Sequence, residues 1–236
     1  MGPCTGPAFD DDWPLPEWTS QRFLRNYAQS KPADYELLTT RTQKGRSAWA
    51  QPLIKENWPS ELADGLASLY ANRELLWELL ESAPQSPCHL DFWPNNVIVT
   101  ERDEVVLIDW AFFGSGSLVE DVGNFIPDAI FDGFFAGEDI GVLESTMWRA
   151  YTAGLADFDV GLDLPLRRYL HASAVKYVWL APLLLARAKD AHQLSYGGEA
   201  IADRVDVNEQ YRARGMALMR LCEWADEAVK EKHEIG

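Results

Sequence analysis

The chain has 236 residues, of which 47% are hydrophobic and 12% aromatic, enough to bury the core of one large domain or two small ones. Its 37 acidic residues against 21 lysines and arginines give a net charge of -16, which argues against a nucleic-acid partner and favours a cationic small molecule. Three widely spaced cysteines, no signal-peptide pattern and no apolar stretch long enough for a bilayer predict a cytoplasmic protein without a membrane partner.

The first quarter of the chain carries few regular patterns. Residues 1–19 are rich in Pro, Gly, Asp and Trp without a period and predict an irregular leader. Residues 20–30 place Phe23, Leu24 and Tyr27 on one side of a short predicted helix. Residues 31–57 are ambiguous, so residues 1–57 are expected to form a leader with helices.

A longer helix is predicted over residues 60–81, because leucines recur at helical spacing at positions 62, 66, 69, 76 and 80. Ser60 stands where a capping residue is expected. Two short β-branched runs follow, at residues 97–100 and 105–110, and the four polar residues between them predict a hairpin.

The segment GSGS at 114–117 lacks the residues that follow a phosphate-binding glycine loop, so we predict a flexible loop there. Further helices are predicted around residues 140–151, from Pro165 to about Lys189, and around residues 211–229. The sequence therefore predicts an α+β, predominantly helical domain with one conspicuous hairpin.

Polar side chains gather at the open end of this hairpin. If its turn is centred on Arg102 and Asp103, Asn96 lies directly opposite Asp109, and opposed Cβ atoms are about 4.5–5.5 Å apart. An amide oxygen and a carboxylate suit Mg²⁺ that shares substrate phosphates, and Asp91 in the preceding loop can accept a proton from an attacking hydroxyl. These are the parts that phosphoryl transfer requires.

The stretch HLDFWPNN at 89–96 resembles the catalytic loop H-x-D-x-x-x-x-N of the aminoglycoside phosphotransferase and choline kinase group of protein-kinase-like small-molecule kinases. LIDW at 107–110 resembles the group's metal-binding aspartate motif, in the same order and at the same short spacing. The resemblance implies a single kinase-like C-lobe domain over residues 1–236, with its catalytic-lobe core over 58–236. It implies ATP and Mg as cofactors. By this resemblance Asp91 is the catalytic base and His89 supports the catalytic loop. Asn96 and Asp109 hold the metal and the nucleotide, and Asp121 braces the loop.

The chain departs from the pattern of the group at several positions. Leu90 stands where the group often has glycine, and Asn95 can replace another glycine because asparagine tolerates a left-handed backbone. Trp93 could line the acceptor pocket, where a flat ring stacks on a sugar or meets a cation. Asp128 and Asp132 could collect the ammonium groups of a cationic acceptor, but a solvated surface is the simpler alternative.

Kinases of this group also need an N-terminal lobe of strands with a phosphate-covering loop and a lysine. Only 88 residues precede His89, and none of them shows such a strand. The N-lobe is therefore expected to be short, missing or supplied by a partner chain. Two hypotheses follow, an ATP- and Mg-dependent kinase of a small cationic or sugar-like molecule and a non-catalytic kinase-like binding protein; a metal-dependent hydrolase is a third.

Overall fold

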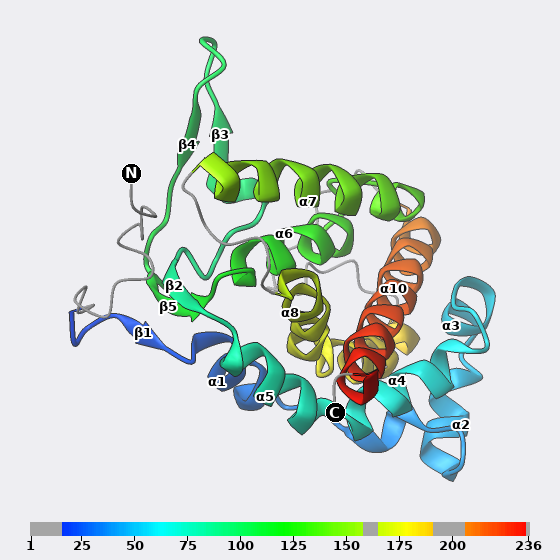
Figure 1. Cartoon of the computed structure of the whole chain (residues 1–236). Coiled ribbons are helices and arrows are strands. Elements are labelled where there is room, and N and C mark those ends of the chain that lie inside the picture. Colours follow the sequence, from blue (N-terminus) through cyan, green and yellow to red (C-terminus); the bar gives the residue numbers. More distant parts are fainter. Residues whose placement is uncertain (1–15, 158–164, 191–205, 235–236) are drawn as a thin grey trace.

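The computed structural model describes residues 16–157, 165–190 and 206–234. Helices make up most of it (Figure 1): α1 (Phe23–Ser30), α2 (Gln43–Trp49), α3 (Pro52–Asn57), α4 (Leu62–Ala71), α5 (Arg73–Ser82), α6 (Glu120–Phe131), α7 (Ile140–Asp157), α8 (Leu166–Ala172), α9 (Leu180–Arg187) and α10 (Val207–Glu234). Short 3-10 turns are η2 (Tyr35–Leu38), η3 (Pro94–Asn96), η4 (Gly137–Asp139), η5 (Ser173–Tyr177) and η6 (Ala188–Asp190). The strands are β1 (Ser20–Gln21), β2 (Gln85–Cys88), β3 (Val97–Val99), β4 (Val105–Leu107) and β5 (Gly114–Ser117).

The long helix α10 lies at the centre of the helical core and packs against α3, α4, α6 and α8. Its buried face includes Tyr211, Leu218 and Trp224, each at most 1% exposed. Close approach to α4 requires Gly65, where an added Cβ would lie 3.0 Å from the Cβ of Cys222. Burial of each large apolar side chain contributes about 1.5–3 kcal/mol, so this seam anchors the helices behind the site.

The GSGS segment is not a flexible loop but the central strand of a three-stranded sheet. β5 pairs in parallel with β1 and antiparallel with β2, with Ser20 opposite Gly114 and Gln85 opposite Ser117. Glycine and serine give no alternating apolar pattern, which is why the sequence did not reveal a strand. β1 and β2 supply hydrogen bonds on both sides of β5. Glycine is required at position 114 because an added Cβ would lie 2.1 Å from the carbonyl oxygen of Ser20.

The predicted hairpin exists as β3 and β4, but its register differs by one residue from the prediction. Val97 lies opposite Leu107 and Val99 opposite Val105, so Asn96 faces Ile108, whose N–H donates to the Asn96 carbonyl at 3.0 Å. The cause is the turn: Asp103 is left-handed, with a φ of 58°, which gives a three-residue loop and shifts the partners by one position.

Two helix predictions also change. The predicted helix 60–81 is two helices, α4 and α5, that meet at Asn72, and Ser60 caps neither of them. The helix expected from Pro165 to Lys189 is divided into α8, η5 and α9. This stretch, Leu166–Arg187, is long and apolar enough to cross a membrane, but 83% of its most apolar window is buried within the fold, as expected of core helices.

The ambiguous residues 31–57 form η2, α2 and α3 and no strand. Leu37, Leu38 and Ile54 join the same core cluster as residues of α5, α6 and α10. Within the described part of the chain, the strands total five, and they do not build a separate strand-rich lobe over the hairpin.

Candidate active site

The loop from β2 to β3 fixes the orientation of Asp91. The Asn96 side-chain nitrogen Nδ2 donates to the Asp91 carbonyl at 2.8 Å and to its carboxylate Oδ2 at 2.9 Å. Asn96 is buried, whereas Asp91 is half-buried. Because no described residue donates to Asp91 Oδ1, this oxygen remains for a ligand hydroxyl.

Asp121, in the first turn of α6, holds the start of the same loop. Its Oδ2 accepts from the His89 N–H and its Oδ1 from the Leu90 N–H, both at 2.8 Å. Leu90 adopts a left-handed backbone with a φ of 64°, which costs a non-glycine residue about 1–2 kcal/mol. Two charge-assisted hydrogen bonds and the nearly complete burial of the Leu90 side chain offset this cost.

His89 connects the loop to the hairpin through its ring. Nδ1 accepts from the Asp91 N–H at 3.3 Å, so Nε2 carries the proton and donates to the Ile108 carbonyl at 2.8 Å. The ring is 2% exposed. With both nitrogens engaged by the backbone, His89 supports the loop and is not placed to move a proton.

Asp109 follows β4 and is exposed, with a left-handed backbone at a φ of 59°. Although it is not the register partner of Asn96, it lies near enough to Asp91 to raise the pKa of that carboxyl. No group of three His, Cys, Asp or Glu residues suited to a metal occurs in the described ranges. The donors present are the Asp109 carboxylate and the Asn96 amide oxygen, whose nitrogen is occupied by Asp91; such a set fits Mg²⁺ that keeps waters and phosphate oxygens as its other ligands.

The pKa of Asp91 is raised above its ordinary value, chiefly because burial disfavours the charged form. Donation from Asn96 and the charge of Lys176 act in the opposite direction, and Asp128 and Asp109 raise the pKa further. A carboxylate shifted in this way is a stronger proton acceptor than one in water.

Lys176 is a charged neighbour of Asp91 that the sequence analysis does not place in the site. It is 5% exposed, and its Nζ lies 3.6 Å from Asp128 Oδ2. The signal in the sequence is a lone lysine within the apolar run 174–186. Since a buried cation needs carboxylate partners, such a lysine indicates acidic groups packed against it.

The acidic segment after the metal motif is not a uniformly solvated surface. Asp128 is 3% exposed and accepts a hydrogen bond from the Tyr177 hydroxyl at 2.6 Å, in addition to the ion pair with Lys176. It is therefore engaged within the core and not placed to collect an ammonium group. Asp132 lies at the C-terminal cap of α6 and is half-buried.

Trp93 is half-buried beside the catalytic loop, and its ring meets Phe134 edge to face with centroids 6.0 Å apart. Phe134 in turn lines a cavity of about 350 Å³ between the end of α6 and α10, together with Glu138, Glu209 and Arg212.

Asn95 does not adopt a left-handed backbone, contrary to expectation: it lies in η3, and the left-handed residue of the loop is Leu90.

A family model described as the phosphotransferase enzyme family matches residues 21–157 of the chain. The match includes the catalytic loop, the hairpin and Asp121. No curated protein and no solved structure matches the chain significantly.

Proposed function

The chain belongs to the phosphotransferase enzyme family, and we propose that it transfers the γ-phosphoryl group of ATP to a hydroxyl of a small cationic or sugar-like molecule. The observation that supports this most directly is the Asp91–Asn96 pair, held by Asp121 and His89 at the base of the hairpin. It combines an oriented proton acceptor with an amide oxygen suited to a metal.

In the proposed reaction, the acceptor oxygen attacks the γ-phosphorus while the bond to the bridging oxygen of ADP breaks. The proton of the acceptor hydroxyl passes to Asp91 Oδ1, the carboxylate oxygen that Asn96 leaves free. Asn96 keeps the carboxylate in place, because its nitrogen donates to both the backbone and the side chain of Asp91. General-base assistance of this kind contributes about 10²–10⁴-fold in rate.

Asn96 Oδ1 and the Asp109 carboxylate are the proposed ligands of magnesium, which would neutralise charge on the transferred phosphoryl group. Two features fit this role. The nitrogen side of Asn96 is already occupied, and Asp109 is exposed beside Asp91, where a nucleotide can approach.

The cationic or sugar-like nature of the acceptor is supported by the surface next to Trp93. The neighbouring cavity carries Glu138 and Glu209 against one arginine, Arg212, and its Phe134 contacts the Trp93 ring. Flat aromatic rings and carboxylates are the groups that bind sugars and ammonium ions. The net charge of -16 favours the same class of ligand.

A second candidate is a binding protein that does not catalyse transfer alone, or that needs a partner chain to supply a nucleotide lobe. It is favoured by the helical residues 31–57 and by the hairpin, on which Ile98, Val99, Val105 and Val106 are 43–65% exposed. An isolated two-stranded hairpin is only marginally stable in water, so a lobe that covers these side chains would stabilise it.

We propose that either form works in the cytoplasm, where the buried thiols of Cys88 and Cys222 stay reduced.

Calorimetric titration of ATP with Mg²⁺ into the purified chain tests the first proposal. Asp109→Asn is the test variant, and Asp103→Asn is the matched control, because Asp103 is an exposed aspartate of the same hairpin with a φ of 58°. We expect metal-dependent binding in the wild type and in the control, and at least tenfold weaker binding in Asp109→Asn. A folded wild-type chain that does not bind ATP would contradict the first proposal and favour the second candidate.

A further inference from the structure

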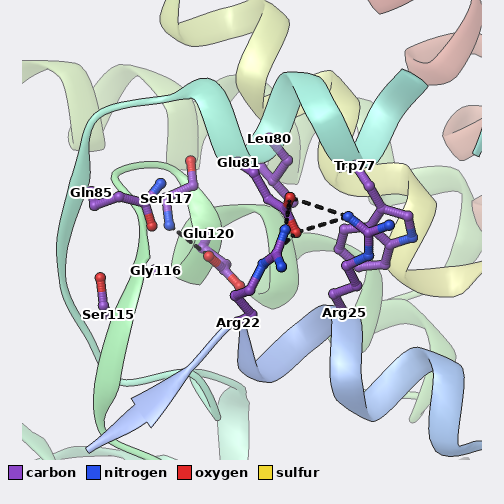
Figure 2. Close-up of a pocket in the computed structure, with 10 residues that line it drawn as sticks. All are labelled: Arg22, Arg25, Trp77, Leu80, Glu81, Gln85, Ser115, Gly116, Ser117 and Glu120. Carbon is purple, nitrogen blue, oxygen red and sulfur yellow. Dashed lines mark hydrogen bonds and ion pairs between the residues drawn. The ribbon is translucent and has the colours of Figure 1, made fainter. Parts of the chain in front are cut away.

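A second cavity, of about 350 Å³, lies away from the proposed catalytic groups, between α1, α5 and β5 (Figure 2). Trp77 and Leu80 of α5 give it an apolar wall. Asp91, Asn96 and Asp109 do not line it. A ligand held here would therefore not occupy the site of phosphoryl transfer.

An ion-pair network of four charged groups lies at one side of this cavity, and three of the four line it. Arg25 donates to Glu81 at 3.0 and 3.1 Å and to Glu74 at 2.9 Å. Arg22 also pairs with Glu81, through both Nε and a terminal nitrogen. Figure 2 shows Arg22, at the N-terminal cap of α1, and Arg25, within α1, both reaching toward Glu81. Glu74 does not line the cavity, but its pair with Arg25 completes a network of two cations and two carboxylates that has no net charge.

The opposite side carries Glu120, a carboxyl group without a counter-ion. Glu120 is 6% exposed, and its Oε2 accepts from the Ser117 N–H at 2.6 Å. Within the described ranges no cation forms an ion pair with it. Burial raises its pKa to about 7, and Asp121 and Glu81 add to the rise, while the Ser117 N–H and Lys176 act against it. Above about pH 7, Glu120 therefore supplies a negative charge that no ion pair compensates.

Ser117 provides a second unsatisfied group at the same place. It lines the cavity and is 1% exposed, and its hydroxyl has no hydrogen-bond partner among the described residues. Ser117 precedes Val119, the N-cap of α6, and Glu120 is the first residue of that helix, so the bond from the Ser117 N–H to Glu120 does not form a capping box. No helix cap therefore accounts for the unpartnered hydroxyl of Ser117.

The Glu120 carboxylate fits at this position because Gly116, which also lines the cavity, has no side chain. A Cβ at Gly116 would lie 2.6 Å from Glu120 Oε2 and 2.9 Å from a methyl carbon of Leu90. The carboxylate thus lies against the strand that supports the catalytic loop, one residue before Asp121.

We propose that this cavity is a second binding site, for a small ligand with an N–H-bearing cationic group such as an amidinium or a primary ammonium. Glu120 accepts the cation, the Ser117 hydroxyl accepts a further N–H, and Trp77 and Leu80 pack against the carbon skeleton of the ligand. Binding at this site does not depend on catalysis at Asp91.

Benzamidine and its neutral isostere benzamide form a matched pair of probes for calorimetric titration at pH 8 and pH 6. We expect benzamidine to bind the wild-type chain at pH 8 at least tenfold more tightly than benzamide. Its affinity should fall about tenfold at pH 6, because a carboxyl group with a pKa of about 7 is then largely protonated. Equal affinity for the two probes at pH 8 would overturn the proposal.

Variants locate the bound probe. Glu120→Gln should lose at least tenfold in affinity for benzamidine, and Ser117→Ala should lose less. Glu78→Gln, an exposed change on α5 outside the cavity, should bind as the wild type does. If Asp91→Asn abolished binding and Glu120→Gln did not, the probe would occupy the catalytic region and the second site would be refuted.

The wild-type protein alone gives an independent measurement, which serves if Glu120→Gln does not fold. Titration at pH 7 in two buffers with different ionisation enthalpies counts the protons released on binding. We expect release of about half a proton, since the cation favours the ionised form of Glu120. No proton release would contradict the role of Glu120.

Discussion

The side-chain nitrogen of Asn96 donates to both the main-chain carbonyl and the carboxylate of Asp91, at 2.8 and 2.9 Å. The two residues are five positions apart, and η3, which ends at Asn96, brings the amide back over the aspartate. One carboxylate oxygen is thereby fixed and the other left open, which is the arrangement that a positioned proton acceptor requires.

Asp91→Asn removes the proton acceptor and keeps the size of the side chain. We expect the rate of ADP formation, measured in a screen of hydroxylated amines and sugars, to fall about 10²–10⁴-fold. The dissociation constant for ATP with Mg²⁺ should stay within about threefold of the wild-type value, because Asp91 is not a proposed metal ligand. Wild-type turnover in this variant would show that Asp91 is not the base.

Asp121→Ala removes the acceptor of two backbone N–H groups in the catalytic loop. Hydrogen bonds to a charged group contribute about 1.5–3 kcal/mol each, and solvent that enters the space recovers part of this. We expect the free energy of unfolding, from urea titration, to fall by about 2–4 kcal/mol. Glu74→Ala, at an exposed position on α5, serves as the control and should change it by less than about 1 kcal/mol.

Leu90 offers a test of backbone strain, because its φ is 64° and its side chain is 1% exposed. Truncation of a buried leucine to alanine costs about 2–5 kcal/mol, and the alanine still bears the left-handed backbone. Glycine loses the same contacts but relieves about 1 kcal/mol of strain. Leu90→Gly should therefore be less stable than the wild type and more stable than Leu90→Ala; the opposite order in urea unfolding would show that the strain is negligible.

His171 should make the protein sensitive to acid. Burial lowers its pKa to about 4, and the charges of Arg167 and Arg220 act in the same direction, whereas Glu144 acts against them. The Oε2 atom of Glu227 lies 3.0 Å from Nδ1 of His171. Because the folded-state pKa is below the ordinary value of 6.5, the unfolded chain binds the proton more tightly. Stability from this group is complete above about pH 6.5 and is lost as the pH falls toward 4.

Between pH 7 and pH 4.5 this group should cost the wild type about 2 kcal/mol of unfolding free energy. His171→Gln should show a decline smaller by that amount, measured by urea unfolding at a series of pH values. His89→Gln is unsuitable as a control because His89 supports the catalytic loop. Identical slopes for the wild type and His171→Gln would contradict the low pKa of His171.

The sequence described the loop at residues 89–96 more accurately than it described the surrounding structure. His89, Asp91 and Asn96 share one short loop, so their proximity follows from local chain geometry and could be predicted. The partner of Asn96 across the hairpin could not, because a single left-handed residue, Asp103, changes the register by one. The strand β5 was missed because glycine and serine carry no side-chain periodicity.

The surroundings of the acidic residues depended on contacts between distant segments. Asp128 was expected at the surface or in an acceptor pocket, but Lys176 and Tyr177, about fifty positions later in the chain, enclose it. Glu120 and Asp121 are neighbours on α6, yet one lines the second cavity and the other holds the catalytic loop. A single sequence does not specify such differences, because they arise from which elements pack on each face of a helix.

By itself, the sequence determined the family of the chain, its mostly helical character and the loop with its hairpin, since these depend on residue types at short spacing and on local periodicity. The tertiary structure decided which carboxylates are free and which are paired, the left-handed conformations of Leu90 and Asp109, and the presence of a second cavity beside Glu120. The physical reason is that burial and charge compensation are set by side chains that meet only when distant parts of the chain pack together.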